Sequence, residues 1–282
     1  MSWLVTGGAG QLGSALQRVL GGRGQRFLAP AHAELDICDD AQLARALARD
    51  APRVVVNCAA LTKVDACERE PELAERANAQ AVAQLARACA AAGAKLVQLS
   101  TDYVFAGDGQ RPYREGDAPA PRSVYGRTKL AGEQAALAAP GALVVRTSWV
   151  YGRGRNFPAA ILAQARAGKP LRVVADQRGR PTYAADLAEA IVQLVAARAS
   201  GIVNFANDGE ATWLDFARAV LDSCGFADRP IQPLTTEELG LPAPRPRYSV
   251  LDLAKARMLG IVARDWRAAL AAYLASPDAP AQ

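Results

Sequence analysis

The chain has 282 residues, of which 51% are hydrophobic and 22% charged, and its net charge is +5. This composition indicates a globular protein of one large domain or two closely packed ones, and it excludes a disordered chain. The basic residues are spread out with no run of five, so we expect no nucleic-acid partner, and no apolar run reaches the roughly 20 residues that span a membrane. A strand-like segment at residues 3–7 leaves no room for a signal peptide, so we expect a cytoplasmic protein.

Cysteine and histidine usage argues against a metal centre. The five cysteines include no Cys-x-x-Cys pair, and they predict reduced, mostly buried thiols: Cys38, Cys58, Cys67, Cys89 and Cys224. His32 is the only histidine, which excludes a multi-histidine metal site. From the residues alone we therefore predict no metal ligands.

Along the chain, apolar strand-like runs alternate with helical stretches rich in Ala and Leu. Strands are expected at 3–7, 26–29, 54–59, 95–100 and 143–148, and helices at 12–20, 41–49, 72–92 and 124–138. This alternation predicts βαβ units and an α/β fold, a Rossmann-type doubly wound parallel sheet covered on both faces. Gly93 is expected to end the third of these helices.

After residue 148 the sequence becomes rich in Gly, Pro and Arg, which indicates a second, smaller C-terminal region. We predict a dinucleotide-binding domain at 1–148 and about 182–206, because the segment 184–206 has the pattern of a helix and a strand that return to the sheet. An interleaved substrate-binding region is expected at about 149–181 and 207–282. Within it, Thr212 and Asp215 predict a helix start with a capping box, whereas 241–248 cannot be helical.

Directly after the first strand, Gly7, Gly10 and Gly13 are spaced as Gly-x-x-Gly-x-x-Gly at the start of a helix. Glycines at this place allow a tight turn and a close approach of the backbone to a pyrophosphate, which the helix N–H groups then face. The spacing alone is weak, since three glycines also suit a purely structural turn. Their position between strand and helix favours nucleotide binding.

The residues at the end of the second strand bear on the choice of cofactor. Sites that prefer NADH place an Asp or Glu there to hold the ribose 2′-hydroxyl. Here residues 29–32 read Ala-Pro-Ala-His and the first acid is Glu34, but no Arg is present to attract a 2′-phosphate. We therefore predict NADPH, with NADH also usable. Asp36 and Ile37 either flank the adenine, or Asp36 is only the N-cap of the next helix.

Tyr125 and Lys129 stand four residues apart at the start of a predicted helix, and thus on one face of it. A neighbouring ammonium is expected to lower the pKa of the phenol from about 10, which would make it a better proton donor or acceptor. Thr101 and Asp102 follow the fourth strand, at the sheet edge where ligands bind, and a hydroxyl there can hydrogen-bond a reacting oxygen. Each feature alone also has a structural explanation, as a surface helix pair or a capped turn.

Six segments, in this order, closely resemble one family: TGGAGQLG, VVNCAALTKVDACE, STDYVFAG, VYGRTKLAGE, RTSWVYG and DQRGRPT. The resemblance is to the extended short-chain dehydrogenases/reductases and, among them, to the dTDP-4-dehydrorhamnose reductases, and it runs from residue 2 to about residue 260. It implies reduction of the C4 keto group of dTDP-4-dehydro-6-deoxy-L-mannose to dTDP-L-rhamnose with hydride from NAD(P)H. This is a step of dTDP-rhamnose biosynthesis for lipopolysaccharide or cell-wall polysaccharide.

The same resemblance implies roles for individual residues. It makes Thr101, Tyr125 and Lys129 catalytic, with Tyr125 as the proton donor and Lys129 as a ligand of the nicotinamide ribose. The glycine loop and the resemblance together give these further cofactor contacts: Gly7, Gly10, Gln11, Leu12, Gly13, Asp36, Ile37, Ala60, Leu61 and Thr62. The implied contacts of the dTDP-sugar substrate are Thr101, Asp102, Trp149 and Asn156.

The resemblance leaves some questions open. Some family members are Mg²⁺-dependent dimers that use a glutamate early in the first helix; Ala15 stands there, so a homodimer and a need for Mg²⁺ both stay open. Related dehydratases and epimerases commonly carry an acidic pair after the strand-end threonine, where this chain has Asp102-Tyr103. The remaining alternatives are another sugar-nucleotide 4-ketoreductase and a non-catalytic, NADP-binding regulatory subunit of the methionine adenosyltransferase type.

Overall fold

The computed structural model describes residues 1–280, and the main sheet within them has six strands in the order β10-β5-β4-β3-β1-β2. These strands are β1 (Ser2–Thr6), β2 (Arg26–Leu28), β3 (Val54–Asn57), β4 (Lys95–Thr101), β5 (Leu143–Thr147) and β10 (Gly201–Asn204). Neighbouring strands pair in parallel, as predicted. The chain runs from β1 outward to β2 and then crosses to β3, so the order reverses beside β1, the place where α/β sheets bind ligands.

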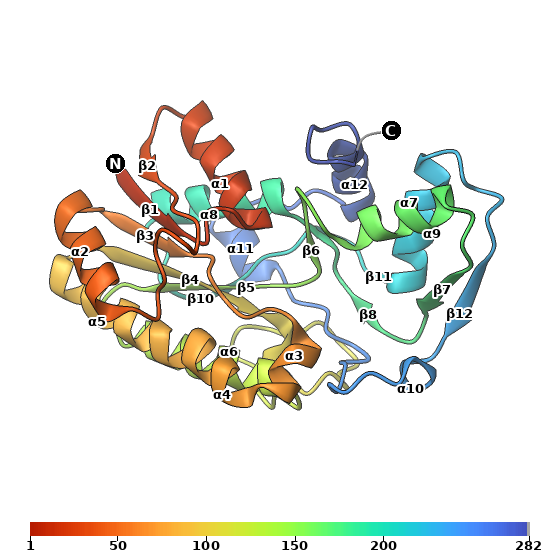
Figure 1. Ribbon diagram of the computed structural model, residues 1–282, viewed down its shortest axis with the longest axis horizontal. Helices are drawn as coiled ribbons and strands as arrows, with labels where there is room; N and C mark the ends of the chain where they lie inside the picture. The colour runs from red at the N-terminus through yellow and green to blue at the C-terminus, as the bar shows by residue number, and fades with distance from the viewer. Residues whose placement is uncertain (281–282) are drawn as a thin grey trace.

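Helices cover both faces of this sheet (Figure 1). One face carries α1 (Gln11–Gly22), α8 (Ala184–Ala196) and α11 (Ala254–Met258), and the other carries α2 (Asp40–Asp50), α5 (Ala81–Ala92) and α6 (Val124–Leu137). The central strands carry apolar side chains on both faces because both faces are buried; Val55 and Val56, for example, point to opposite layers and are fully buried. Strand β10 follows α8 and pairs with β5, which confirms the expected return of this segment to the sheet.

The helix expected at 72–92 is present but is not one regular helix. It follows α3 (Val64–Arg69) and consists of α4 (Pro71–Glu75), the π-helical turn η1 (Arg76–Gln80) and α5, which ends at Gly93 with φ +64° as predicted. Single π turns of this kind often occur at functional sites. Here the wider turn carries Asn78, whose buried side chain is used below.

A smaller second layer of structure lies beside the carboxyl edge of the sheet (Figure 1). It contains three short strand pairs, β6 (Val150–Tyr151) with β9 (Thr182–Tyr183), β7 (Leu171–Val174) with β12 (Ile231–Leu234), and β8 (Arg178–Gly179) with β11 (Ala211–Thr212). Its helices are α7 (Phe157–Arg166), α9 (Trp213–Ser223), α10 (Thr236–Leu239) and α12 (Trp266–Leu274). An aromatic core of its own holds this region together, and it includes Tyr151, Phe216 and Trp266.

Local signals in this second region behave as the sequence indicates. Thr212 caps α9 and Asp215 completes the capping box, while residues 241–248 form no helix.

The five cysteines are free, as expected, but only Cys67 and Cys89 are buried, so the expectation of mostly buried thiols is wrong. No helix within residues 1–280 is long and apolar enough to cross a membrane, and no group of three or more acidic, His or Cys side chains there could hold a metal ion.

Candidate active site

The loops that follow the central strands meet at one edge of the sheet. In the strand register Thr6 of β1 lies beside Asn57 of β3, and Thr101 of β4 lies beside Thr147 of β5. The glycine loop, the segment 58–63, the pair Thr101-Asp102 and the segment from Ser148 therefore leave the sheet side by side. This edge is where doubly wound sheets place their ligands.

The glycine loop after β1 has the shape of an anion cradle. Gly7 has φ +65°, and its carbonyl accepts a hydrogen bond from the Gly10 N–H at 2.9 Å. A Cβ atom at Gly8 would lie 2.1 Å from the Ala29 oxygen, and one at Gly13 would lie 2.4 Å from the Gly7 oxygen. Helix α1 starts at this loop with no acidic residue in its first turn, so its free N–H groups suit a pyrophosphate.

A chain of buried polar side chains links the ends of β1, β3 and β4 to helix α6. The Thr6 hydroxyl donates to Asn57 at 2.6 Å, and the Asn57 amide donates to Gln98 at 2.8 Å. Gln98 in turn donates to the Leu99 carbonyl, which also accepts a hydrogen bond from the Lys129 ammonium at 2.6 Å. Lys129 is thus held against β4, two residues before Thr101.

Burial sets the protonation of Lys129 and Tyr125. Desolvation lowers the pKa of Lys129 from 10.5 to about 8, against the opposing charge of Glu133. Desolvation also raises the pKa of Tyr125 well above its usual range, and a hydrogen bond with Thr101 lowers it only in part. The predicted lowering of the Tyr125 pKa is therefore wrong in direction, because loss of water dominates and the neighbouring charge of Asp102 raises the pKa further. At neutral pH the phenol is protonated, which is the form that donates a proton.

Polar groups beside this pair suit a hydroxylated ligand. Asp102 is 2% exposed, and burial raises its pKa to about 6 although the hydrogen bond with Thr101 opposes this. The Thr101 hydroxyl lies 3.0 Å from a carboxylate oxygen of Asp102. The buried hydroxyls of Ser100 and Thr147, at the ends of β4 and β5, have no hydrogen-bond partner within the described residues. Such groups are satisfied when a polar ligand binds.

Trp149 and Asn156 belong to the second region. Trp149 follows β5 with φ +47°, and its ring stacks on Trp213 with centroids 3.7 Å apart. Gly179, in the segment 176–182, lies directly against the Trp149 ring. The Asn156 side chain caps α7 through Ala159 and binds Tyr273, so its polar atoms already have protein partners.

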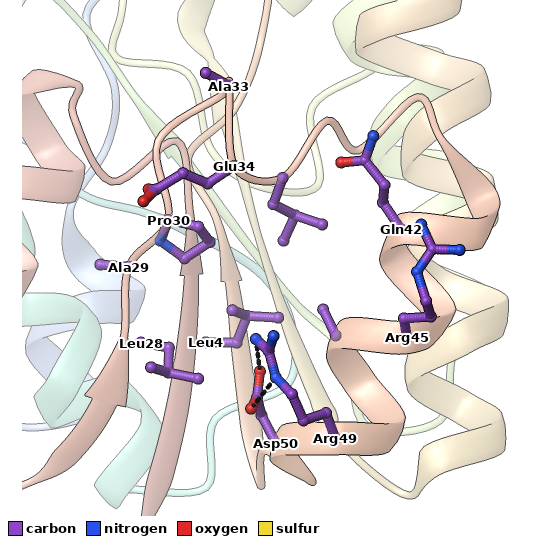
Figure 2. Close-up of a pocket in the computed structure, with 12 residues that line it drawn as sticks. Leu4, Leu28, Ala29, Pro30, Ala33, Glu34, Gln42, Arg45, Arg49 and Asp50 are labelled. Carbon is purple, nitrogen blue, oxygen red and sulfur yellow. Dashed lines mark hydrogen bonds and ion pairs between the residues drawn. The ribbon is translucent and has the colours of Figure 1, made fainter.

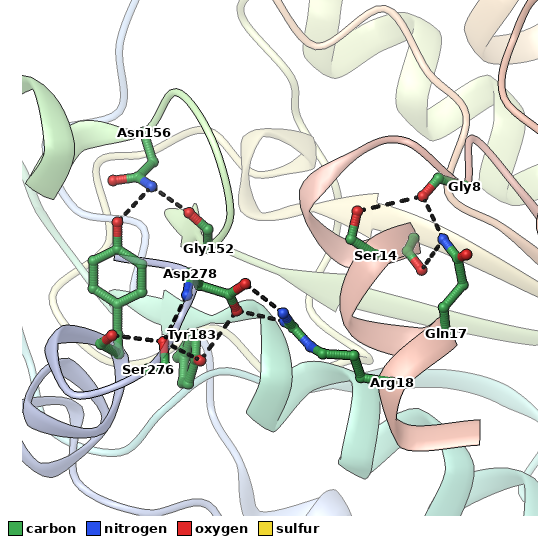
Figure 3. A network of polar contacts seen from close by, with 11 residues as sticks. Gly8, Ser14, Gln17, Arg18, Gly152, Asn156, Tyr183, Ser276 and Asp278 are labelled. Carbon is green, nitrogen blue, oxygen red and sulfur yellow. Dashed lines mark hydrogen bonds and ion pairs between the residues drawn. The ribbon is translucent and has the colours of Figure 1, made fainter. Parts of the chain in front are cut away.

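Direct contacts join helix α1 to the second region (Figure 3). The Gln11 amide donates to the Arg155 carbonyl at 3.1 Å, and the Arg18 guanidinium pairs with both oxygens of the buried Asp278. Asp278 also accepts a hydrogen bond from the Tyr183 hydroxyl at 3.2 Å. The helix that starts at the glycine loop is therefore tied to the segments that carry Trp149 and Asn156.

Comparison with known proteins agrees with this geometry. The sequence profile of the RmlD substrate binding domain family matches residues 1–278. A dTDP-4-dehydrorhamnose reductase of Streptomyces griseus is 45% identical over 277 residues, which cover 95% of this chain and 91% of that protein. The chain belongs to the dTDP-4-dehydrorhamnose reductase family. Another reductase of this name, from Mycobacterium tuberculosis, is 44% identical over 97% of this chain and 92% of its own length.

Solved structures of the same family superimpose closely. A dTDP-4-dehydrorhamnose reductase from Clostridium acetobutylicum has a TM-score of 0.94 at 37% identity and covers 98% of this chain and 99% of its own. One from Bacillus anthracis, in complex with NADP, has a TM-score of 0.94 at 35% identity and covers 97% of this chain and 98% of its own. The predicted Rossmann-type fold and the family are both confirmed.

Some of the expected cofactor contacts of this reductase-family chain have buried side chains or are already hydrogen-bonded within the protein. Leu12 is buried in the core, so only its backbone is free to serve a ligand, and Ile37 is buried as well. Asp36 accepts a hydrogen bond from the Cys38 N–H at 2.9 Å. It does not cap α2; Asp39 does, so that alternative for Asp36 is wrong.

Asn78 is a site residue that the sequence reasoning missed. Its side chain accepts from the Leu61 N–H at 2.9 Å and donates to the Leu61 carbonyl at 3.1 Å, which holds the segment Ala60, Leu61 and Thr62. It also donates to the Thr128 hydroxyl at 3.2 Å, one residue before Lys129.

Gly8 provides a direct test of the cradle. In Gly8→Ala the new methyl group would overlap the Ala29 carbonyl, so we expect the loop to shift, NADPH affinity to fall at least tenfold and the melting temperature to drop. Calorimetric titration and thermal melts measure both. Gly22→Ala is the matched control, because nothing lies within 4 Å of that Cβ position. Equal NADPH affinity in the two variants would contradict the assignment of the cradle.

Proposed function

We propose that this chain reduces the C4 keto group of dTDP-4-dehydrorhamnose to the alcohol of dTDP-L-rhamnose, with NADPH as the reductant. One observation carries the proposal: this member of the reductase family has Thr101, Tyr125 and Lys129 together at the ligand-binding edge of its sheet. The curated relatives that bear the name of this reaction support it. In this proposal the sugar nucleotide lies between that edge and Trp149.

The residues present fit a nicotinamide dinucleotide. The glycine cradle and the start of α1 would hold the pyrophosphate, and the segment Ala60, Leu61 and Thr62 would border the nicotinamide half. Lys129, fixed by the Leu99 carbonyl, would hold the nicotinamide ribose. When bound, the reduced nicotinamide supplies the hydride that C4 receives.

The proton comes from Tyr125 in this proposal. As the C4 oxygen gains negative charge, the Tyr125 hydroxyl donates its proton to it, and the keto group becomes a secondary alcohol. Thr101 is hydrogen-bonded to Tyr125 and aligns the phenol toward that oxygen. The Lys129 ammonium then stabilises the phenolate left behind. Asp102 and the unpartnered hydroxyls of Ser100 and Thr147 offer contacts to the sugar ring.

The reduction rate should depend on the proton of Lys129. Its pKa is about 8 because burial disfavours the ammonium, so the charge is present below this pH and is lost as pH rises through it. We expect kcat to fall as pH rises above about 8, and we expect kcat of Lys129→Met to show no such fall. The pH profile of kcat, measured with saturating substrate and cofactor, checks this. A rate that stays constant through pH 8 in the wild-type protein would contradict the role.

A second candidate substrate class has specific support. A probable dTDP-4,6-dihydroxy-2-methyloxan-3-one 4-ketoreductase from Streptomyces antibioticus is 44% identical over 96% of this chain. A dTDP-4-keto-6-deoxy-D-glucose reductase from Streptomyces niveus is 39% identical over 95% of it. The reaction would be the same reduction at C4 of a hexose that differs in configuration or lacks the 2-hydroxyl group.

A panel of dTDP-linked 4-keto sugars separates these candidates. Loss of the absorbance of NADPH reports turnover, and we expect the highest kcat/KM with dTDP-4-dehydrorhamnose. A higher value with another 4-keto sugar would move the assignment to that sugar. No turnover with any of them, in folded protein that binds NADPH, would overturn the catalytic proposal and favour a regulatory, NADP-binding role.

A further inference from the structure

Trp149 has an unusual backbone conformation for a bulky residue. Its φ is +47°, in the left-handed region that residues other than glycine rarely adopt. Among the other described residues that are not glycine, Ala51 and Arg198 share a positive φ, but they lie at the ends of helices α2 and α8, where this conformation is common. Trp149 instead follows strand β5. Such a conformation persists only where the surrounding structure imposes it.

Hydrogen bonds fix the main chain around Trp149. The Ser148 hydroxyl donates to the Arg180 carbonyl at 2.8 Å, and the Trp149 carbonyl accepts a hydrogen bond from the Thr182 N–H at 3.2 Å. Strand β6, which follows, pairs with β9. These bonds set the path of the backbone, but they do not fix the torsions of the Trp149 side chain, which depend on contacts to its ring.

The paired strands β8 and β11 bring two residues to the Trp149 ring. Gly179 of β8 pairs with Ala211 of β11, and Trp213 follows β11 directly as the first residue of α9. A Cβ atom at Gly179 would lie 2.7 Å from a ring carbon of Trp149. The rings of Trp149 and Trp213 are stacked, with centroids 3.7 Å apart and planes at 9° to each other. The indole of Trp149 is thus held by ring contacts from this strand pair.

Trp213 is itself held in one orientation. Its indole N–H donates to the Gln177 side chain at 3.1 Å, and the Gln177 amide donates to the Thr236 hydroxyl at 3.0 Å. Gln177 is buried, so these hydrogen bonds are shielded from water. The Phe157 ring also packs against Trp213, with centroids 4.6 Å apart. None of the roles proposed above uses Trp213 or Gln177.

We infer that Trp213, held by Gln177, is a positioning residue for Trp149. In the proposed function the sugar nucleotide lies between the sheet edge and Trp149. Because the stack on Trp213 gives the Trp149 ring a single orientation, the sugar is held where its C4 atom meets the hydride and Tyr125. The inference rests on this proposed role of Trp149, and it adds two residues that act through Trp149.

Cofactor binding provides an internal reference, because the expected cofactor site is built from other elements. A cavity of about 680 Å³ lies between the end of β2 and α2, and all the residues that line it belong to the segment 4–50 (Figure 2). They include Pro30, whose carbonyl accepts a hydrogen bond from the Gly8 N–H of the glycine loop. A change at Trp213 should therefore alter the kinetics of the sugar and leave the KM for NADPH unchanged.

A double-mutant cycle with Trp149 tests the inference. Trp213→Leu removes the flat ring, and we expect kcat/KM for dTDP-4-dehydrorhamnose to fall by about ten- to 100-fold, because the sugar contact is displaced. In the Trp149→Ala background the same substitution should change kcat/KM by less than about twofold, since no ring is left to position. Trp213→Phe, which keeps a flat ring, should recover most of the loss. Calorimetric titration with dTDP-L-rhamnose in the presence of NADP repeats the cycle without turnover.

Gln177→Leu gives a second cycle, which decides the question if Trp213→Leu does not fold. It should lower kcat/KM less than Trp213→Leu, and only where Trp149 is present. Trp266→Phe is the matched control: Trp266 is fully buried in the same aromatic core, and within residues 1–280 its indole N–H has no hydrogen-bond partner and its ring packs on Phe216. It should lower the melting temperature and leave kcat/KM nearly unchanged.

The inference is overturned if Trp213→Leu, or Gln177→Leu in its place, lowers kcat/KM by the same factor with and without Trp149. It is also overturned if the KM for NADPH rises equally, or if Trp266→Phe lowers kcat/KM as much. Wild-type protein that binds dTDP-L-rhamnose but reduces no sugar would overturn the proposed function alone, and the titration cycle would still decide the inference. Wild-type protein that neither binds nor reduces a sugar nucleotide would overturn both.

Discussion

Tyr125→Phe is expected to lower kcat for carbonyl reduction by roughly 10²–10⁴-fold, because the general acid is lost and no other protonated group replaces it. The ring stays in place, packed edge-on against Tyr103 with centroids 5.6 Å apart, so the fold should be kept. NADPH affinity should change little, since the phenol hydroxyl contributes to chemistry more than to binding. Steady-state kinetics and calorimetric titration measure the two effects separately.

Tyr103→Phe is the matched control for this experiment. It removes a hydroxyl from the neighbouring ring, which bonds Arg245 and not Thr101. We expect Tyr103→Phe to keep kcat within a few-fold of the wild-type value. If Tyr125→Phe kept a similar rate, Tyr125 would not be the proton donor.

The largest effect on stability is expected from the ion pair between Glu133 and Arg146. The two side chains are 1% and 2% exposed and make two hydrogen bonds of 2.8 and 2.7 Å, which join α6 to β5. Arg146 also lies over the Phe105 ring. Removing one partner leaves a buried charge unpaired, so Glu133→Ala or Arg146→Ala should lower the free energy of unfolding by about 3–5 kcal/mol.

Urea unfolding gives this free energy directly. The double variant Glu133→Leu with Arg146→Met should be more stable than either single variant, because it removes both charges and fills the space with apolar atoms. Arg111→Gln breaks an exposed pair with Asp117 and should change stability little. Single variants at Glu133 and Arg146 with wild-type stability would show that water, and not the partner, satisfies each charge.

Much of the fold is predictable from the sequence because its signals are local. Strands β3 and β5 contain continuous apolar runs, as in 54–56, and Gly93 ends its helix through a left-handed conformation that glycine adopts easily. The capping box of Thr212 and Asp215 is likewise a short-range signal. The spacing of Tyr125 and Lys129 places them on one helical face in the same way.

The features that the sequence does not predict depend on contacts between distant segments. Asn78 joins Leu61 to Thr128 across 17 and 50 residues, and nothing near it in the chain indicates these partners. The raised pKa of Tyr125 follows from desolvation, which depends on the whole fold around the phenol.

The central claim, hydride transfer to C4 with a proton from the protein, is tested most directly with NADPH deuterated at the transferable position of its nicotinamide. We predict that one equivalent of cofactor is oxidised per dTDP-4-dehydrorhamnose and that the deuterium is found at C4 of the product by NMR. Deuterium at another carbon, or conversion of the sugar without net oxidation of NADPH, would contradict the account.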